Sequence, residues 1–253
     1  MTAQQTPLFQ YALRLGDTCL ILSHRLSEWA GHAPVVEEEL ALANVALDLL
    51  GQAQLWLGLA GEVEGASRGA DKLAYLRDAR EFRNLLLVEQ PNGDFACTMA
   101  RQLFFDAWHL LLLRELARSI DTRIADIAAK ALPEATYHLG RSRDWMVRLG
   151  DGTDESHRRA QAAIDDLWMY TGELFEMDEV DQALLADGVA VDLAALRQPW
   201  LEHVGETLRE ATLELPRSDW AQRGGKQGVH SEHLGYVLAD LQFLQRAYPN
   251  ATW

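Results

Sequence analysis

Three stretches of the 253-residue chain repeat apolar residues every three or four positions, and each contains one polar residue near its middle. Residues with this spacing share one face of an α-helix, whereas a strand alternates at every second position. The pattern therefore predicts an all-α fold in which long helices pack through these faces. The three rows are Glu38, Leu42, Val45, Leu49, Gln52, Trp56 and Leu59; Phe95, Met99, Leu103, Asp106, Leu110 and Leu113; and Ile124, Ala128, Ala131, Ala135, His138, Ser142 and Trp145.

Glycine, proline and capping residues mark where the helices begin and end. We expect a ferritin-like helical bundle, one domain over residues 1–253, with a core bundle at about 7–175 and additional C-terminal helices at about 176–253. A helical solenoid is the alternative, but it requires a repeat of fixed period, and none is found. The expected helices lie at about 7–29, 35–60, 71–88, 94–118, 121–149, from 153, 178–185, 193–212 and 231–247.

The net charge of −15 argues against binding to nucleic acid or to an anionic membrane, because both repel an acidic surface. The N-terminus has no basic region followed by an apolar signal segment. The segment 40–60 is apolar, but Asn44, Asp48 and Gln52 would be costly in lipid. We therefore expect a helix buried inside a helical protein or at an interface. The cysteines, Cys19 and Cys97, both fall in predicted helices, which favours a reducing cytoplasm over a disulfide framework.

Gln52, Asp106 and His138, with Glu28 at the end of the first helix, are the residue types of a carboxylate-bridged di-iron bundle. Such a site takes a Glu and a Glu-x-x-His pair from each half of the fold. No glutamate in this chain is followed by a histidine three residues later, and Leu49 and Ala135 stand where the two bridging glutamates would be needed.

Glu28, Asp106 and His138 supply one imidazole and two carboxylates, which are too few for two irons. Gln52 is a weak neutral ligand. A single polar residue in an apolar row is more often a satisfied core residue than a ligand. A buried polar group without a partner costs a few kcal/mol, roughly 2 to 7. We therefore expect these side chains to meet one another, a ligand or trapped water.

Other pairs have similar spacing. Asp106 and His109 share a helix face, and Glu134 precedes His138 by four residues but points roughly 40° away from its row. Asp154 and His157 lie at a helix start, where a solvated cap is the better interpretation.

Several longer stretches resemble the C subunits (PaaC-type) of the bacterial phenylacetyl-CoA epoxidase, and the resemblance covers nearly the whole chain. These subunits form the structural part of a multicomponent ring-epoxidising oxygenase. The matching stretches are Tyr11–Asp17, Glu28–Pro34, Leu40–Asn44, Leu47–Ala53, Asn84–Gly93, Glu134–Leu139 and Gly224–Gly235.

The resemblance implies a metal-free structural subunit of phenylacetate degradation that pairs with a di-iron catalytic A subunit of similar fold. The A subunit's Asp-Glu-Ala-Gly-His motif falls on the stretch from Asp48 to Gln52, so its Glu and His ligands fall on Leu49 and Gln52. Its second Glu-x-x-His falls on Ala135 and His138, and its remaining acidic positions on Glu28 and Asp106. No catalytic, cofactor-binding or metal-binding residue carries over to this chain.

The same resemblance implies further partners: a small B subunit and, transiently, a reductase that carries FAD and a 2Fe-2S cluster. The glycine-rich stretch Gly224, Gly225, Lys226 and Gly228 could bind a CoA phosphate through backbone amides, but a loop that docks on a partner chain is the favoured interpretation. Two alternatives remain open. One is an active oxygenase with an unusual site of Glu28, Asp106, His109 and His138, and the other is a stand-alone helical scaffold with an unrelated partner.

Overall fold

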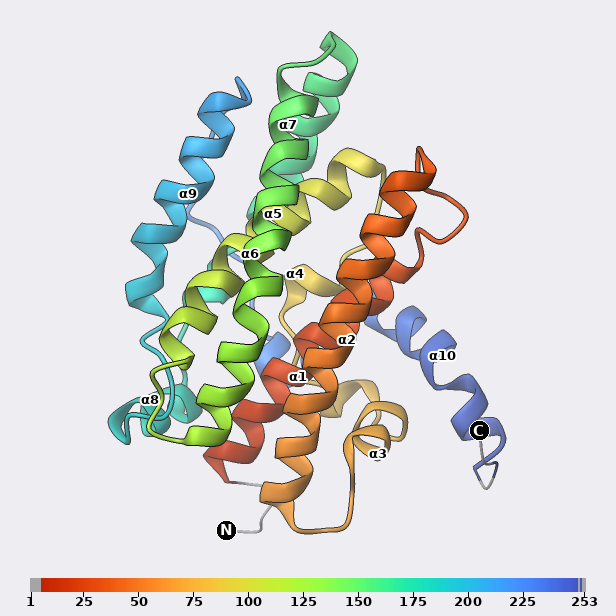
Figure 1. Ribbon diagram of the computed structural model, residues 1–253, viewed down its shortest axis with the longest axis vertical. Helices are drawn as coiled ribbons and strands as arrows, with labels where there is room; N and C mark the ends of the chain where they lie inside the picture. Colours follow the sequence, from red (N-terminus) through yellow and green to blue (C-terminus); the bar gives the residue numbers. More distant parts are fainter. Residues whose placement is uncertain (1–5, 250, 252–253) are drawn as a thin grey trace. The chain divides into compact units, whose positions relative to one another are not determined.

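The computed structural model describes residues 6–249 and 251. The described residues form ten α-helices and no strand, which confirms the all-α, ferritin-like class (Figure 1). The chain divides into two compact units. The first contains the residues up to Pro91 together with those from Gly224 onward, and the second contains Asn92–Arg223.

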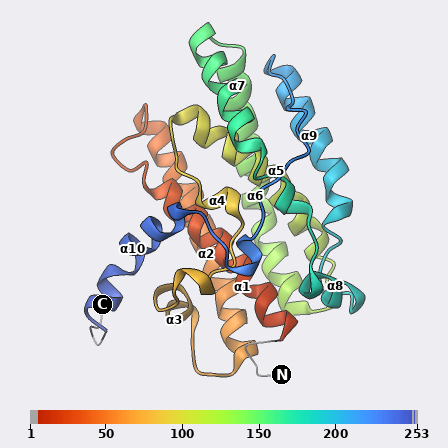
Figure 2. The same ribbon diagram turned by 180° about the vertical axis from the view of Figure 1, so that it is seen from behind.

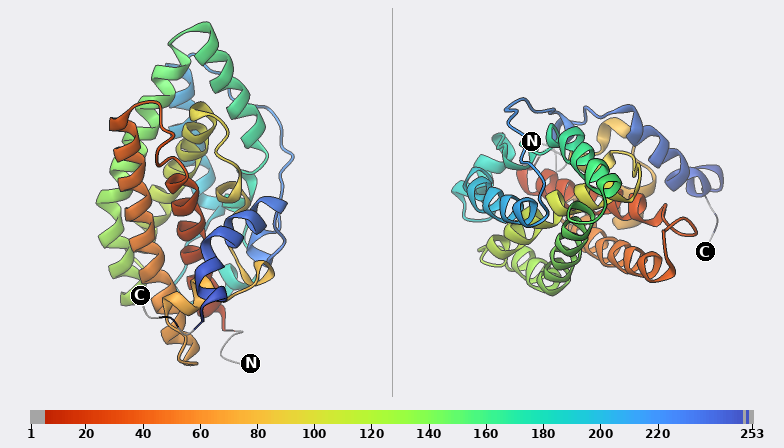
Figure 3. Two further views of the ribbon diagram at one scale, coloured as in Figure 1. Left: turned by 90° about the vertical axis from the view of Figure 1, so that its right-hand side faces the viewer. Right: turned by 90° about the horizontal axis from the view of Figure 1, so that it is seen from above.

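The first unit is built on a hairpin of two long helices, α1 (Pro7–Ser27) and α2 (Val36–Glu64), which run side by side (Figure 1; Figure 3, left). The two backbones approach closely at Gly16, where an added Cβ would lie 2.8 Å from side-chain carbons of Leu57. The Ser23 hydroxyl of α1 donates to the Ala46 carbonyl of α2 at 2.8 Å. This bond ties the two helices together nearer to the loop that connects them. α2 ends at Gly65, whose φ of 67° is the left-handed conformation that terminates helices.

The expected helix at 71–88 is wrong. The chain there forms α3 (Ala70–Tyr75), a 3-10 turn at Ala79–Glu81 and the single turn α4 (Leu86–Glu89). Side chains of α1 take the backbone amides that a continuous helix would have used. The Arg83 amide donates to Asp17 at 2.8 Å, and the Leu85 amide donates to the Thr18 hydroxyl at 3.3 Å. Arg77 adds a buried ion pair with Asp17.

The C-terminal helix α10 (Glu232–Ala247) belongs to the first unit and packs on α1, α3 and α4 (Figure 2). Its start is held by Glu89, which is fully buried. The Glu89 carboxylate accepts hydrogen bonds from the Ser231 amide at 2.6 Å, His230 Nδ1 at 2.9 Å and Asn84 Nδ2 at 2.9 Å. The Glu89 backbone carbonyl accepts two more from Arg25 of α1, at 2.7 and 3.1 Å.

His230 lies between two acceptors, because its Nε2 is 3.0 Å from the Phe82 carbonyl. A neutral imidazole has only one N–H, so two facing acceptors favour the doubly protonated, charged ring. Burial lowers the pKa of His230, but the hydrogen bond and negative charge of Glu89 outweigh burial and raise the pKa above its usual value.

The second unit is built on α5 (Phe95–Leu116) and α6 (Thr122–Gly150), packed against each other and against α7 (Asp154–Trp168) and α9 (Arg197–Glu210). The short helix α8 (Glu179–Ala186) precedes α9. Asp94, Asp121 and Thr153 cap three of these helices, and each accepts from a backbone amide of the helix that follows. α6 continues through Pro133 as one helix.

Indole donors anchor the core of the second unit. Trp200 Nε1 donates to the Phe104 carbonyl and Trp108 Nε1 to the Leu174 carbonyl, each at 2.9 Å. The boundary between the units differs from the expected division at residue 175, because 176–223 belong with α5–α7 while the last helix returns to α1–α4.

Glu89→Gln should destabilise the protein by about 3 kcal/mol at pH 6, because the buried His230 cation loses its carboxylate. The raised pKa of His230 sets the sign of the pH dependence. Its stabilising contribution is complete below the unfolded value of 6.5 and is lost as pH rises through the folded pKa. The loss caused by the variant should therefore be smaller at pH 9 than at pH 6, as measured by urea unfolding. Glu115→Gln, at an exposed ion pair, is the control and should change stability by less than about 0.5 kcal/mol. An equal loss at both pH values would contradict the charged imidazole.

Candidate functional site

Three of the six positions at which the resemblance places di-iron ligands lie in the first unit, and none offers a buried charged donor. Leu49 of α2 is fully buried, with 0% of its surface exposed. The Gln52 amide oxygen lies 3.9 Å from the Cys19 thiol of α1. Glu28, at the end of α1, forms an ion pair with Arg25 at 2.8 Å, and 43% of its side chain is exposed. The structure therefore gives Glu28 and Gln52 separate partners.

The other three positions lie in the second unit, on facing helices. Asp106 of α5 and His138 and Ala135 of α6 are all buried. Asp106 interacts electrostatically with His138, and the Ser142 hydroxyl, also on α6, donates to the Leu139 carbonyl at 3.3 Å. The structure thus brings Asp106 and His138 together, while Ala135 contributes only a methyl group.

Burial shifts the pKa values of the ionisable side chains in the polar cluster around Asp106 and His138. Desolvation raises the pKa of Asp106 to about 6, although the charge of His138, the Ser142 side chain and two nearby arginines oppose the increase. Desolvation, followed by repulsion from His138, lowers the pKa of His109 to about 3. At pH 7 Asp106 is therefore mostly ionised and His109 neutral.

α5 also carries buried polar atoms that make no hydrogen bond with the described residues. Among them are Oδ1 of Asp106, Nδ1 of His109 and both side-chain atoms of the Gln102 amide. Buried groups of this kind usually bind ordered water, which is the occupant that the sequence pattern leads us to expect.

These residues do not fit a di-iron centre. Two adjacent cations need carboxylates that bridge and neutralise them, and the side chains at Leu49 and Ala135 have no donor atom. Within the described part of either unit, no three His, Cys, Asp or Glu side chains are grouped so that they could hold a metal ion.

The alternative pairs have structural partners. The His109 ring packs against Phe105, with 4.8 Å between ring centroids, and stacks on Trp108. His157 Nδ1 lies 2.8 Å from the Gly150 carbonyl, and Thr153 caps the same helix. Glu134 is half-buried on α6.

The glycine-rich loop packs against its own unit. Gly225–Gln227 form a short 3-10 turn, and Lys226 is only 7% exposed. Gly228 has a φ of 79°, and an added Cβ there would lie 2.3 Å from the Arg80 carbonyl oxygen. The loop thus holds Lys226 away from solvent, and contact with a CoA phosphate stays a prediction.

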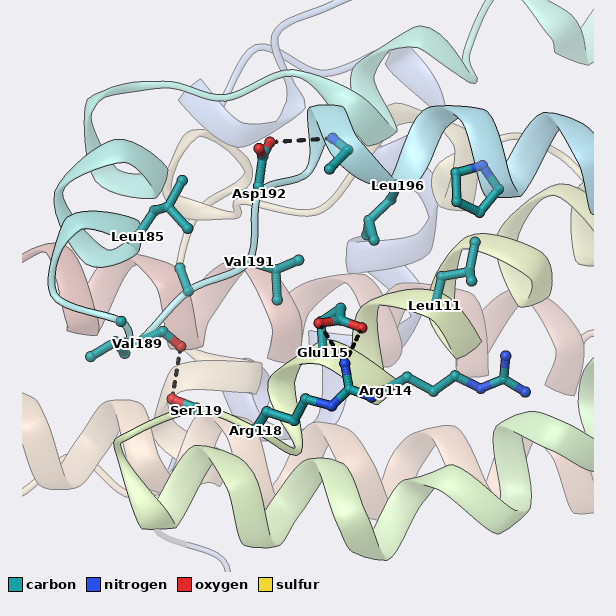
Figure 4. Close-up of a pocket in the computed structure, with 14 residues that line it drawn as sticks. Leu111, Arg114, Glu115, Arg118, Ser119, Leu185, Val189, Val191, Asp192 and Leu196 are labelled. Atoms are coloured by element: carbon teal, nitrogen blue, oxygen red, sulfur yellow. Dashed lines mark hydrogen bonds and ion pairs between the residues drawn. The ribbon is translucent and has the colours of Figure 1, made fainter.

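A groove of about 600 Å³ that was not expected from the sequence lies within the second unit (Figure 4). It is lined by the end of α5 and by the segment from Leu185 to Pro199. The Arg118 guanidinium is occupied by Glu115 at 2.9 Å, and the Ser119 hydroxyl donates to the Val189 carbonyl at 2.8 Å. The lining of this groove combines residues about 70 positions apart in the chain. No local sequence pattern could therefore have indicated the groove.

The described residues form a ferritin-like helical protein, and the two positions at which bridging carboxylates were expected hold the apolar side chains of Leu49 and Ala135. The chain belongs to the family of phenylacetic acid catabolic proteins, whose model matches residues 1–253. It is 54% identical over 246 residues to the C subunit of the 1,2-phenylacetyl-CoA epoxidase of Escherichia coli K12. The match covers 97% of this chain and 99% of that protein.

Asp106→Asn should stabilise the protein, because the amide keeps the shape of the side chain without a buried charge. The rise in pKa from 3.8 to about 6 corresponds to about 3 kcal/mol against the ionised form. Because the folded pKa is raised, wild-type stability falls as pH rises through this window. The gain should therefore be about 3 kcal/mol at pH 8 and about half of that at pH 5, measured by urea unfolding.

Asp126→Asn, at an exposed position of the facing helix, is the matched control and should change stability by less than about 0.5 kcal/mol. A loss of stability in Asp106→Asn at pH 8 would show instead that the charged carboxylate is held by interactions stronger than its desolvation.

Proposed function

We propose that this chain is the non-catalytic structural C subunit of a phenylacetyl-CoA 1,2-epoxidase that acts in aerobic phenylacetate degradation in the cytoplasm. In this role it pairs with the di-iron catalytic A subunit and stabilises it. Epoxidation of the ring of the CoA thioester with oxygen takes place on the A subunit. The 54% identity to the Escherichia coli protein, over nearly the full length of both chains, supports the assignment.

The observation that carries the non-catalytic role is the burial of Leu49 and Ala135. Both lie where a bridging carboxylate would have to stand, and neither has an atom that can bind a cation. A charged group introduced at either position would also have to overcome the cost of leaving water. The chemistry that oxygen activation requires is therefore assigned to another chain.

The acidic character of the chain supports a protein partner of complementary charge. By the same resemblance the proposal includes the small B subunit and transient contact with a reductase that carries FAD and a 2Fe-2S cluster. This chain is proposed to bind none of these cofactors.

An active oxygenase is the second candidate, and its support is the buried pair of Asp106 and His138, with Glu28 and His109 as the other donors. Iron analysis separates the two functions. The purified chain should hold far less than one iron per molecule, while the A subunit prepared in the same way retains its metal. Near-stoichiometric iron that is lost in His138→Ala would refute the structural role.

Co-expression with the A subunit tests the pairing. The tagged chain should retain the A subunit through affinity and size-exclusion chromatography as one complex. Separate elution of the two chains at micromolar concentration would favour a stand-alone scaffold with an unrelated partner.

A further inference from the structure

One face of α2 carries an apolar stripe that the first unit leaves in solvent. Its members are spaced alternately by four and three residues, and all are exposed: the apolar Val36, Leu40, Ala43, Leu47 and Leu50, and the polar Gln54 at its end. By ideal helix geometry they lie within an arc of roughly 80°. Leu47 is 64% exposed. We call this set the α2 stripe.

The opposite face of α2 is the one that the fold buries, through Leu42, Val45, Leu49 and Trp56. The helix is thus apolar on two faces, and only one of them is covered. Among the described helices, α2 alone is long and apolar enough to cross a membrane by length and composition, and 44% of its most apolar window is buried. A helix that is apolar all round is normally buried all round. The exposed face of α2 therefore needs a partner beyond the first unit.

The spacing indicates what kind of partner fits. Alternation of four and three residues keeps a stripe facing one neighbouring helix along its length, as in a coiled coil. Gly51 and Gly58 flank the stripe, and an added Cβ at either position would meet no atom within 4 Å. Small residues beside an apolar stripe allow a helix to approach closely.

The negative charge of α2 argues against a second copy of this chain as the partner that covers the α2 stripe. α2 contains acidic residues and no lysine or arginine; the acids are Glu37, Glu38, Glu39, Asp48, Glu62 and Glu64. Glu38 lies in the row of the buried face, and Glu64 is buried and paired with Arg68. Two α2 helices face to face would bring the other four carboxylates together, in addition to a net charge of −15 on each chain. A helix with an apolar face and flanking lysines or arginines is complementary.

We propose that the α2 stripe is the surface on which a helix of the catalytic A subunit packs, an inference that rests on the proposed function. The partner helix places apolar side chains against Leu40, Leu47 and Leu50. Its basic residues face Glu37 and Glu39, which lie on either side of the first turn of the stripe.

The test is affinity for the A subunit in solution. Leu47→Glu should weaken binding at least about tenfold, because it places an unpaired charge in the centre of an apolar interface. Ile120→Glu is the matched control. It introduces the same charge at an apolar residue that is 71% exposed but lies in the other unit, and its affinity should stay within about twofold of wild type. Glu37→Lys combined with Glu39→Lys should slow association several-fold at low salt.

Each outcome has a separate meaning. If the wild-type chain does not bind the A subunit, the proposed function fails. If wild type binds and Leu47→Glu binds equally well, only the α2 stripe is refuted. The thermal midpoint of isolated Leu47→Glu should match that of the Ile120→Glu control, and a drop of several degrees relative to that control would show that the stripe is covered within the chain itself, which also overturns the proposal.

Two further measurements address other occupants. Light scattering of the isolated chain should show a monomer, and a dimer that Leu47→Glu dissociates would assign the stripe to self-association. Sedimentation with phosphatidylcholine vesicles should leave the chain in solution, and binding that Leu47→Glu abolishes would assign the stripe to a lipid surface. Either result overturns the proposal.

Discussion

The buried carboxylate of Glu89 is the interaction on which the first unit depends. A charge with no exposure to water is tolerated only when donors satisfy it, and Glu89 has three, from Ser231, His230 and Asn84. Two of these donors lie more than 140 residues further along the chain. The same residue's backbone carbonyl holds Arg25 of α1. One side chain and its own peptide group therefore join the N-terminal hairpin, the broken segment after α3 and the start of the last helix.

The polar positions at which the resemblance places di-iron ligands have partners within each unit. In the first unit Gln52 lies beside Cys19 and Glu28 is paired with Arg25. In the second unit Asp106 and His138 stay buried together, and desolvation raises the pKa of the carboxyl. A buried ionisable pair is expensive without a cation to share, so its retention costs stability that a fully apolar core would not lose.

Local signals account for the parts of the fold that could be predicted. The caps at Asp94, Asp121 and Thr153 are local features, because each side chain bonds an amide only two or three residues away. The helix expected at 71–88 was wrong because its amides at Arg83 and Leu85 donate to side chains of α1, more than 60 residues earlier. At the candidate site the burial of Leu49 and Ala135 followed from their place in an apolar row. The partner of Gln52 could not be predicted, because it lies on another helix.

The sequence by itself determined where the long helices run and that the two bridging positions have no donor atom, since helical periodicity and side-chain chemistry are local properties. It also determined that α2 is apolar on more than one face. The tertiary structure decided which of those faces is covered, which donors surround Glu89, and which partners the displaced polar residues found. These features depend on contacts between residues far apart in the chain, and only the packing of the helices brings such residues within hydrogen-bonding distance.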